Sequence, residues 1–306
     1  MRRVVVALVS GCLLLLTACA PSGGGAAPPA TDVATAVDVG GRRVWLECHG
    51  PARPGTPTVV LMSGFGNAGD IWDVVDPERT PPPEAVAPAL ARDTRVCAYD
   101  RPGSTRNDGS VTTRSDPAPQ PRTAQDWASE LDAVLTAGGV PGPYVLVAHS
   151  FGGLAARLYA AQHPDRTAGL VMVDSTTEET FALLSPEQQA VLTPPAVPGV
   201  EQIDVAASTD QVAASARERP HPATMPTWVV SAGVTEFPPD FPDLARAVEA
   251  QRTAQSNLAT TTLPGSVHAL ADRSSHYVHV FDPDLVVRAT RDVLARATGP
   301  SSGGTR

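Results

Sequence analysis

The chain has 306 residues and carries 23 basic and 32 acidic side chains, which gives a formal net charge of −9 at pH 7. Because the balance is acidic and no basic cluster is present, the composition argues against nucleic acid as a partner. The length suffices for one large α/β domain between two unstructured ends, and no internal repeat is visible.

The N-terminus has the pattern of an export signal. Two arginines precede an apolar run over residues 4–16, which is too short to span a bilayer comfortably. The run ends at Leu16-Thr17-Ala18-Cys19, which resembles the lipobox of bacterial lipoproteins. This resemblance implies a signal peptide over residues 1–18 and a lipidated Cys19 that anchors the exported chain to the outer face of the cell membrane. The alternative is a plain secretory signal cut close to the same position, which would leave the protein secreted.

The rest of the chain divides by composition. Residues 19–34 are rich in Ala, Pro and Gly and are predicted to form a flexible tether. Residues 35–298 are predicted to form the folded domain, and residues 299–306 a disordered tail. Within the domain, residues 175–225 interrupt the regular pattern with many prolines and polar residues. This segment is predicted to be a small cap insertion.

Strand and helix signals alternate along the domain. Apolar runs of strand type lie at 36–39, 43–47, 58–62, 95–99, 144–148, 169–173, 227–231 and 260–263. Helical spacing is found at 84–91, 124–136, 151–162, 183–192, 242–258 and 284–297. A strand pair followed by β-α alternation predicts an α/β fold, with a mostly parallel eight-stranded sheet and helices on both faces.

One stretch carries the strongest chemical signal. The apolar run 144–149 stops at Ser150, and Gly152 and Gly153 follow where helical spacing begins. Small residues beside the turn let the backbone reverse sharply, so the serine is expected to stand on the tip in a strained conformation. The new helix N-terminus directs backbone N–H groups at whatever the serine attacks. This pattern predicts a nucleophile elbow, and the alternative is an ordinary serine in a tight turn.

Several motifs besides the elbow resemble those of the α/β-hydrolase superfamily, over nearly the whole segment 31–298. They are Ser63-Gly64-Phe65-Gly66, Tyr99-Asp100-Arg101-Pro102-Gly103, the strand at 169–175 and Ser275-His276-Tyr277-Val278-His279. Two residues depart from the family pattern, since Ala148 stands at the first elbow glycine and Ser63 at the usual histidine. The resemblance implies an α/β-hydrolase fold and a hydrolytic reaction without a cofactor.

The resemblance also implies roles for groups around the elbow. The backbone N–H groups of Phe65 and Phe151 are expected to form an oxyanion hole, which stabilises the negative charge of acyl transfer. Asp100 and Arg101 are expected to be structural, as a buried ion pair or a turn brace.

Two cysteines, Cys48 and Cys97, lie outside the predicted signal and lipobox, each in a strand-like segment. An exported protein meets an oxidising compartment, so an even pair predicts a disulfide. The α/β-hydrolase resemblance implies that the second strand lies beside the fourth, which would make the two cysteines neighbours. The alternative is two small buried thiols.

A serine hydroxyl needs a neighbouring base, and near neutral pH this base is a histidine oriented by a carboxylate. His276 precedes the final helix by a short loop, where this fold places its base, so we predict that it serves Ser150. His268 and His279 are the alternatives, and His279 otherwise has a packing role. His149, inside the elbow, is expected to face away from the partner of the nucleophile.

The acid of the site has several candidates. Asp174 ends the sixth strand at the carboxyl edge of the sheet, where ligands bind. Glu236 follows the seventh strand, which supplies the acid in most of the superfamily, but its surroundings are Pro-rich and irregular. We therefore favour Asp174 over Glu236, with Asp240 and Asp243 as further alternatives. Asp174 and Glu236 both keep the chain order Ser, acid, His that the elbow fold uses.

Together these residues predict a serine hydrolase. Ser150 attacks a small-molecule carboxylic ester or a related acyl substrate, His276 moves the proton and Asp174 orients the imidazole. Peptidase, thioesterase and cofactor-free haloperoxidase activities stay open. The alternative class is a lipid-anchored binding protein with this fold and no turnover. No metal-ligand spacing is present, and the sequence indicates neither the oligomeric state nor the substrate's size.

Overall fold

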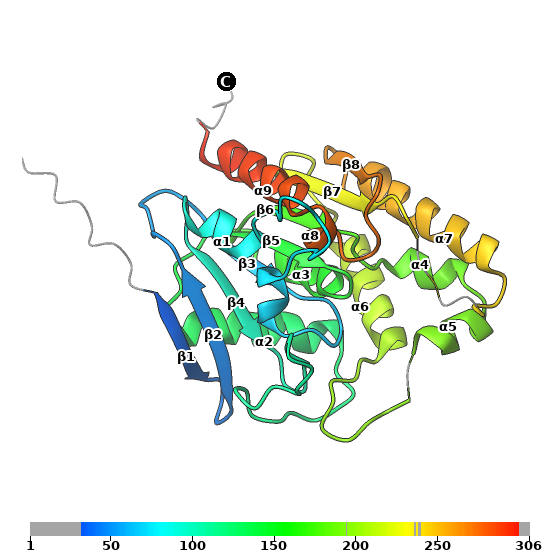
Figure 1. Cartoon of the computed structure of the whole chain (residues 1–306), viewed down its shortest axis with the longest axis horizontal. Coiled ribbons are helices and arrows are strands. Elements are labelled where there is room, and N and C mark those ends of the chain that lie inside the picture. The colour runs from blue at the N-terminus through cyan, green and yellow to red at the C-terminus, as the bar shows by residue number, and fades with distance from the viewer. Residues whose placement is uncertain (1–31, 194, 236, 238–239, 300–306) are drawn as a thin grey trace, which may run out of the picture.

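A computed structural model describes residues 32–193, 195–235, 237 and 240–299. The predicted signal peptide, Cys19, most of the predicted tether, Glu236 and residues 300–306 of the predicted tail lie outside the described residues. The described residues form an eight-stranded sheet with helices on both faces (Figure 1). This is the predicted fold class.

The sheet has the strand order β1-β2-β4-β3-β5-β6-β7-β8. β2 is antiparallel to both β1 and β4, and every other pairing is parallel. The second strand therefore lies beside the fourth, as expected, and β1 begins inside the segment predicted as tether. The strands are β1 (Val33–Asp38), β2 (Arg43–His49), β3 (Thr58–Met62), β4 (Val96–Asp100), β5 (Tyr144–His149), β6 (Thr167–Val173), β7 (Thr227–Ala232) and β8 (Val267–Ala271).

Helices cover the two faces of the sheet in separate groups (Figure 1). Helices α2 and α3 pack on one face, with α6 of the cap segment against them, and α1 and α9 pack together on the other. The helices are η1 (Gly69–Asp73, 3-10), α1 (Val86–Ala91), α2 (Ala124–Ala137), α3 (Gly152–Gln162), α4 (Glu178–Leu183), α5 (Pro186–Leu192), α6 (Val205–Glu218), α7 (Leu244–Asn257), η2 (Leu258–Thr262, π-helical), α8 (Val278–Phe281) and α9 (Pro283–Thr298).

The central strands are apolar on both sides because both sides are covered. Every residue of β3 and β5 is buried. Leu146 of β5 belongs to the core under α2 and α3, whereas its neighbour Val147 belongs to the core under α9. This alternation follows from the strand geometry, in which successive side chains point to opposite faces. The carboxyl ends of β5 and β6, which carry the candidate site, are thus held by a core on each side.

The predicted strand at 260–263 is wrong. Residues Leu258–Thr262 form a π-helical turn that continues α7, and the last strand of the sheet is β8, which pairs with β7. β8 lies at the edge of the sheet and most of its side chains are exposed. Its sequence therefore lacks the apolar run by which the inner strands were recognised.

The cap segment also differs from the prediction. The helix predicted at 183–192 is α5, which begins only at Pro186 because Ser185 caps it, and the separate helix α4, which ends at Leu183, was not predicted. Helix α6 was not predicted. Its sequence is rich in Ala, Ser and polar residues, and the structure buries only Ser208 and Val212 from it, so its apolar face is narrow.

A disulfide joins the second and fourth strands where the sequence predicted one. Cys48 of β2 lies directly opposite Cys97 of β4, and their sulfur atoms are bonded across a sequence separation of 49 residues. Both residues are buried. The bond fastens the antiparallel β1-β2 pair to the parallel part of the sheet.

Removal of this disulfide is expected to lower the free energy of unfolding by about 4 kcal/mol, because a cross-link over 49 residues restricts the unfolded chain. Urea unfolding of the wild type, of the wild type in reductant and of the Cys48→Ala/Cys97→Ala variant checks this. Equal midpoints in all three measurements would contradict it.

Candidate active site

Ser150 lies on a sharp turn between β5 and α3. Its φ is +52°, in the left-handed region that residues other than glycine rarely adopt. The N–H of Ser150 donates to the carbonyl oxygen of Val173 at 3.2 Å, and the N–H of Thr176 donates to the carbonyl oxygen of Ser150 at 3.0 Å. A Cβ on Gly152 would lie 2.7 Å from the carbonyl oxygen of Met62, so the turn has no room for a side chain there. The backbone therefore has the geometry predicted for an elbow.

Both departures from the family pattern fit into this arrangement. Ala148 is fully buried, and its carbonyl oxygen accepts a hydrogen bond from Ser175 Oγ at 2.8 Å. Ser63 Oγ donates to the carbonyl oxygen of Ala68 at 2.9 Å and accepts from Trp72 Nε1 at 3.2 Å. Ser63 thus braces the turn that follows β3.

His276 links Ser150 to Asp174. Its Nε2 lies 2.9 Å from Ser150 Oγ, and its Nδ1 lies 2.7 Å from Asp174 Oδ2. The carboxylate accepts from Nδ1–H, which leaves the Nε2 lone pair to accept the serine proton. The side chain of Asp174 is 5% exposed and that of His276 is 39% exposed, so the acid is shielded while the imidazole reaches solvent. The structure thus brings together the three residues that the sequence singled out.

The carboxylate of Asp174 is fixed from two sides. Asp174 directly follows β6 with a φ of +38°, and the N–H of Ala232 donates to Oδ1 at 3.0 Å. The other carboxylate oxygen, Oδ2, therefore accepts the hydrogen bond from His276. The alternative acids Asp240 and Asp243 are exposed to solvent, and Glu236 lies outside the described residues.

The alternative bases have other partners. His268 Nε2 lies 2.9 Å from Ser231 Oγ, between the neighbouring strands β8 and β7. His279 is fully buried, with its ring centroid 4.5 Å from that of Trp72. Neither imidazole lies within hydrogen-bonding distance of Ser150 in the described residues.

The turn after β3 lies directly against Ser150. A Cβ on Gly64 would be 2.9 Å from Ser150 Cβ, so this close approach requires glycine. The next residue, Phe65, and Phe151 at the start of α3 have ring centroids 6.0 Å apart. Among the described residues, no acceptor is found for the backbone N–H of Phe65 or of Phe151. Both amides are therefore available to a negative charge that develops beside Ser150.

Asp100 and Arg101 brace the site, but they do not pair with each other. Arg101 is 1% exposed and forms an ion pair with Glu201, with Nε 2.7 Å from Oε1. Asp100 pairs instead with Arg114 at 2.8 Å. The sequence indicated the bracing role, but it gave no signal for Glu201, which comes from the cap segment.

The prediction that His149 faces away from His276 is wrong. The two ring centroids are 4.6 Å apart, and His149 Nε2–H donates to the carbonyl oxygen of His276 at 2.9 Å. Burial, and then the neighbouring His279 and His276 rings, lower the pKa of His149 well below its ordinary value of 6.5. His149 is therefore neutral at pH 7 and supports the backbone of His276.

His279 extends this stack away from solvent. Its ring centroid is 4.4 Å from that of His149, and within the described residues neither of its ring nitrogens has a hydrogen-bond partner. Burial, and then the nearby His276, lower the pKa of His279 to about 3. The side chain therefore packs as a neutral ring that leaves two polar atoms unpaired.

The buried His279 predicts acid sensitivity. In the unfolded chain, residue 279 is an ordinary histidine that becomes protonated below about pH 6.5, whereas in the folded chain it stays neutral down to about pH 3. The free energy of unfolding therefore falls as the pH drops from about 6.5 to about 3. His279→Leu removes this titration and the unpaired nitrogens. When the pH is lowered from 7.5 to 5, the free energy of unfolding of the variant is expected to fall by about 2 kcal/mol less than that of the wild type. Urea unfolding at both pH values measures this, and equal losses would contradict it.

Similarity to known proteins agrees with this fold. The model of the alpha/beta hydrolase family matches residues 59–303, which is more than half of the chain. The chain belongs to this family. The putative carbamate hydrolase RutD of Cronobacter sakazakii is 31% identical to this alpha/beta hydrolase over 121 residues, which cover 40% of this chain and 38% of RutD. Alignments with the first curated relatives span 19% to 39% of the length of those proteins.

Solved structures share the fold of this alpha/beta hydrolase. A putative lipase from Acinetobacter baumannii AYE has a TM-score of 0.51 at 17% identity, over 87% of this chain and 92% of the lipase. The haloalkane dehalogenase DatA from Agrobacterium tumefaciens C58 has a TM-score of 0.58 at 14% identity, over 87% and 97% of the two chains. At these identities the likeness shows the fold alone.

Phe151, the residue after Ser150, contacts two other aromatic rings in this alpha/beta hydrolase. The ring of Phe151 lies 6.0 Å from that of Phe65 and 5.8 Å from that of Phe181, centroid to centroid. Phe181 comes from α4 in the cap segment, and both Phe151 and Phe181 are buried. Phe151 therefore links Phe65, in the turn after β3, to the cap segment through apolar contacts.

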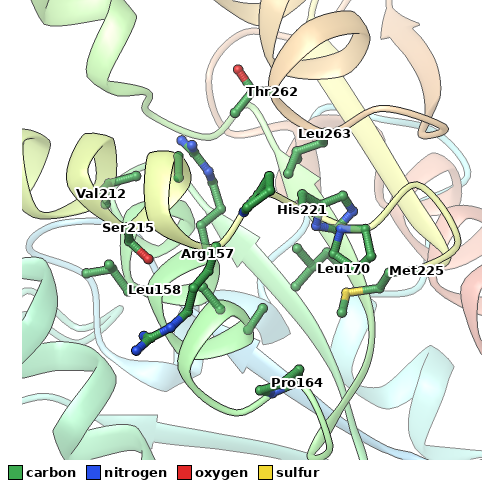
Figure 2. Close-up of a pocket in the computed structure, with 16 residues that line it drawn as sticks. Arg157, Leu158, Pro164, Leu170, Val212, Ser215, His221, Met225, Thr262 and Leu263 are labelled. Carbon is green, nitrogen blue, oxygen red and sulfur yellow. The ribbon is translucent and has the colours of Figure 1, made fainter.

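A separate pocket of about 280 Å³ lies between α3 and α6 (Figure 2). Arg157 and His221 are among the residues that line it, and Ser150 and His276 are not. Arg157 forms an ion pair with Glu178, and burial lowers the pKa of His221 to about 4, so neither of these two residues adds an unpaired charge at pH 7. Arg219, which is exposed, also lines the pocket. This pocket is distinct from the candidate active site.

In the described part of the chain, no group of three or more His, Cys, Asp or Glu side chains is arranged to hold a metal ion. Across those same residues, none of the helices combines the length and the hydropathy needed to cross a bilayer.

Proposed function

We propose that this alpha/beta hydrolase is a serine hydrolase that cleaves a carboxylic ester, or a related acyl substrate, through an acyl-enzyme intermediate. One observation carries the proposal. Ser150 Oγ, His276 and Asp174 form a continuous hydrogen-bonded chain, at 2.9 and 2.7 Å, and the serine stands on a strained turn. A serine hydroxyl gains nucleophilicity in this setting because the base can remove its proton as it attacks.

In the first half of the reaction, Ser150 Oγ attacks the carbonyl carbon while His276 Nε2 takes the hydroxyl proton. Asp174 accepts the hydrogen bond from Nδ1–H and stabilises the imidazolium. The carbonyl oxygen becomes negative and accepts hydrogen bonds from the N–H groups of Phe65 and Phe151. The bond to the leaving oxygen then breaks, His276 protonates the departing alcohol, and the acyl group stays on Ser150.

In the second half, water replaces the alcohol. His276 Nε2 removes a proton from the water as its oxygen attacks the acyl carbon, and the same two N–H groups stabilise the second oxyanion. When the bond to Ser150 Oγ breaks, His276 returns the proton to the serine. The products are a carboxylic acid and the free enzyme, so the cycle needs only water as co-reactant.

The surroundings of Ser150 favour an apolar acyl group. The rings of Phe65, Phe151 and Phe181 make a continuous apolar contact beside the nucleophile. Burial of an acyl chain against such rings contributes about 0.8 kcal/mol for each methylene group.

Rapid mixing with p-nitrophenyl butyrate tests the proposal. We expect a burst of about one equivalent of p-nitrophenol followed by slower steady turnover, and a butyryl adduct on the intact protein, because acylation and deacylation are separate steps. If neither a burst nor turnover above the buffer rate is observed, the result contradicts the proposal and favours the alternative, a binding protein with this fold. Faster cleavage of a butyryl p-nitroanilide than of the ester would indicate a peptidase instead.

We also propose that the chain is exported and anchored to the outer face of the cell membrane through Cys19, or is secreted. The signal-like residues 1–18 support this, and so does the Cys48–Cys97 disulfide, because such bonds persist in oxidising compartments. Expression in a bacterium with labelled palmitate is expected to label the wild type and not a Cys19→Ser variant. Absence of label from both would contradict the anchor.

A further inference from the structure

An ion pair between Arg101 and Glu201 lies deep under the candidate site. Arg101 is 1% exposed and Glu201 is 0% exposed. Arg101 Nε lies 2.7 Å from Glu201 Oε1, and Nη2 lies 3.0 Å from Oε2. The guanidinium also lies over the ring of Trp127, 3.9 Å from its centroid. Burying two charges so completely is costly even when they are paired, so the pair by itself is weak evidence for stability.

The remaining side-chain hydrogen bonds of the pair all go to the turn that carries Phe65. Arg101 donates to the carbonyl oxygens of Ser63 at 3.0 Å and of Gly64 at 2.6 Å. Glu201 Oε2 accepts from the N–H of Gly66 at 2.8 Å. The residues on both sides of Phe65 are therefore held by the ion pair, one through a carbonyl oxygen and the other through an amide.

Glu201 reaches this turn from the cap segment and is itself held in place. Its N–H donates to the carbonyl oxygen of Gly103 at 2.8 Å. At the end of the turn, Arg101 Nη2 also donates to the carbonyl oxygen of Asn67 at 3.2 Å. The buried ion pair thus links three segments, namely the cap, the turn after β4 and the turn after β3.

We infer that Arg101 and Glu201 are positioning residues, which hold the Phe65 N–H where the oxyanion forms. This inference rests on the proposed function. An oxyanion donor lowers the barrier only when it is already aimed at the developing charge, and a displacement of about 1 Å can cost about 100-fold in rate. The ion pair fixes the peptide groups on either side of Phe65 without touching the substrate.

Glu201→Gln tests the role with the smallest change of shape. Both carboxylate oxygens accept hydrogen bonds, one from Arg101 and the other from Arg101 and Gly66. In either orientation, the amide NH₂ of glutamine would face one of these donors and displace the turn. We expect kcat for p-nitrophenyl butyrate to fall about 10- to 100-fold while KM stays within about threefold, since the lost interaction belongs to the transition state.

A second readout separates the oxyanion hole from general damage. Alkyl trifluoromethyl ketones form a tetrahedral adduct with an active-site serine, so their inhibition constant reports on the same N–H donors. In Glu201→Gln this constant is expected to rise by the same factor as kcat/KM falls. If Glu201→Gln does not fold, we expect the same changes in kcat and in the inhibition constant for Arg101→Lys. Lysine keeps the positive charge, but it lacks the planar guanidinium that donates to Glu201 and to the turn at the same time.

Glu130→Gln is the matched control. Glu130 is 4% exposed, and its two oxygens accept from Arg122 and Arg42, each at 2.9 Å, so glutamine creates the same mismatch. Neither arginine has a hydrogen bond to residues 63–67 in the described chain. We expect a similar loss of thermal stability with kcat unchanged.

The outcomes are distinguishable. A fall in kcat and in ketone affinity for Glu201→Gln or Arg101→Lys, without one for Glu130→Gln, supports the inference. Unchanged kcat in folded Glu201→Gln overturns it, as does unchanged kcat in Arg101→Lys where that variant is the substitute. An equal fall of kcat in Glu130→Gln also overturns it. A wild type that neither turns over esters nor reacts with the ketone refutes the proposed function, and the inference fails with it.

Discussion

Replacement of Ser150 by alanine is expected to lower kcat for p-nitrophenyl butyrate by about 10⁵- to 10⁶-fold, while the fold and the affinity for substrate are kept. The hydroxyl is the only part of the side chain that is lost, and its oxygen is the atom that His276 Nε2 contacts at 2.9 Å. Residual activity would come from the oxyanion donors acting on water. Steady-state kinetics on ester substrates, with circular dichroism to check folding, measures the effect.

The chain supplies a closely matched control for this experiment. Ser231 Oγ also lies 2.9 Å from a histidine Nε2, that of His268, but on a regular strand rather than on an elbow. Ser231→Ala is therefore expected to leave kcat within about twofold of the wild type, as is usual for a change away from the reacting groups. Equal activity of Ser150→Ala and the wild type would rule out Ser150 as the nucleophile.

Asp174→Asn is expected to lower kcat by about 10⁴-fold with little change in KM. The N–H of Ala232 donates to Oδ1 of Asp174, so the amide oxygen of asparagine will occupy that position. Its NH₂ group then faces His276 Nδ1 and donates to it. This forces the proton of the neutral imidazole onto Nε2, which can no longer accept the proton of Ser150.

Steady-state kinetics of Asp174→Asn is compared with that of Asp32→Asn. Asp32 also lies near a histidine, with Oδ2 3.2 Å from His49 Nδ1, but this pair is exposed at the far edge of the sheet. We expect Asp32→Asn to match the wild type. A loss of less than about tenfold in Asp174→Asn would indicate that another carboxylate orients His276, and Glu236→Gln would then be the next variant to measure.

Local sequence patterns were sufficient for the parts of the site that lie close together in the chain. The strand 144–149, Ser150 and the following small residues predicted the elbow, because its geometry depends on near neighbours. The pairing of Ser150 with His276 spans 126 residues, and it was predicted from the resemblance of several motifs to one fold. The inner strands themselves were predicted from local sequence, since buried parallel strands have continuous apolar runs.

Other features depend on contacts for which no local pattern exists. Asp174 and Glu236 each follow a strand at the same edge, and no spacing rule separates them. The orientation of His149 was predicted wrongly, because its ring packs against residues 276 and 279, which are remote in sequence. Glu201 lies 100 residues from Arg101 in a segment without periodicity, so the buried ion pair was not foreseeable.

The central claim is that His276 makes Ser150 nucleophilic, and the rate of phosphonylation by a fluorophosphonate probe tests it most directly. We predict that the wild type is labelled within minutes, that peptide mapping places the adduct on Ser150, and that His276→Ala reacts at least about 10³-fold more slowly. Equal labelling rates in the two proteins, or an adduct on a different residue, would contradict the account.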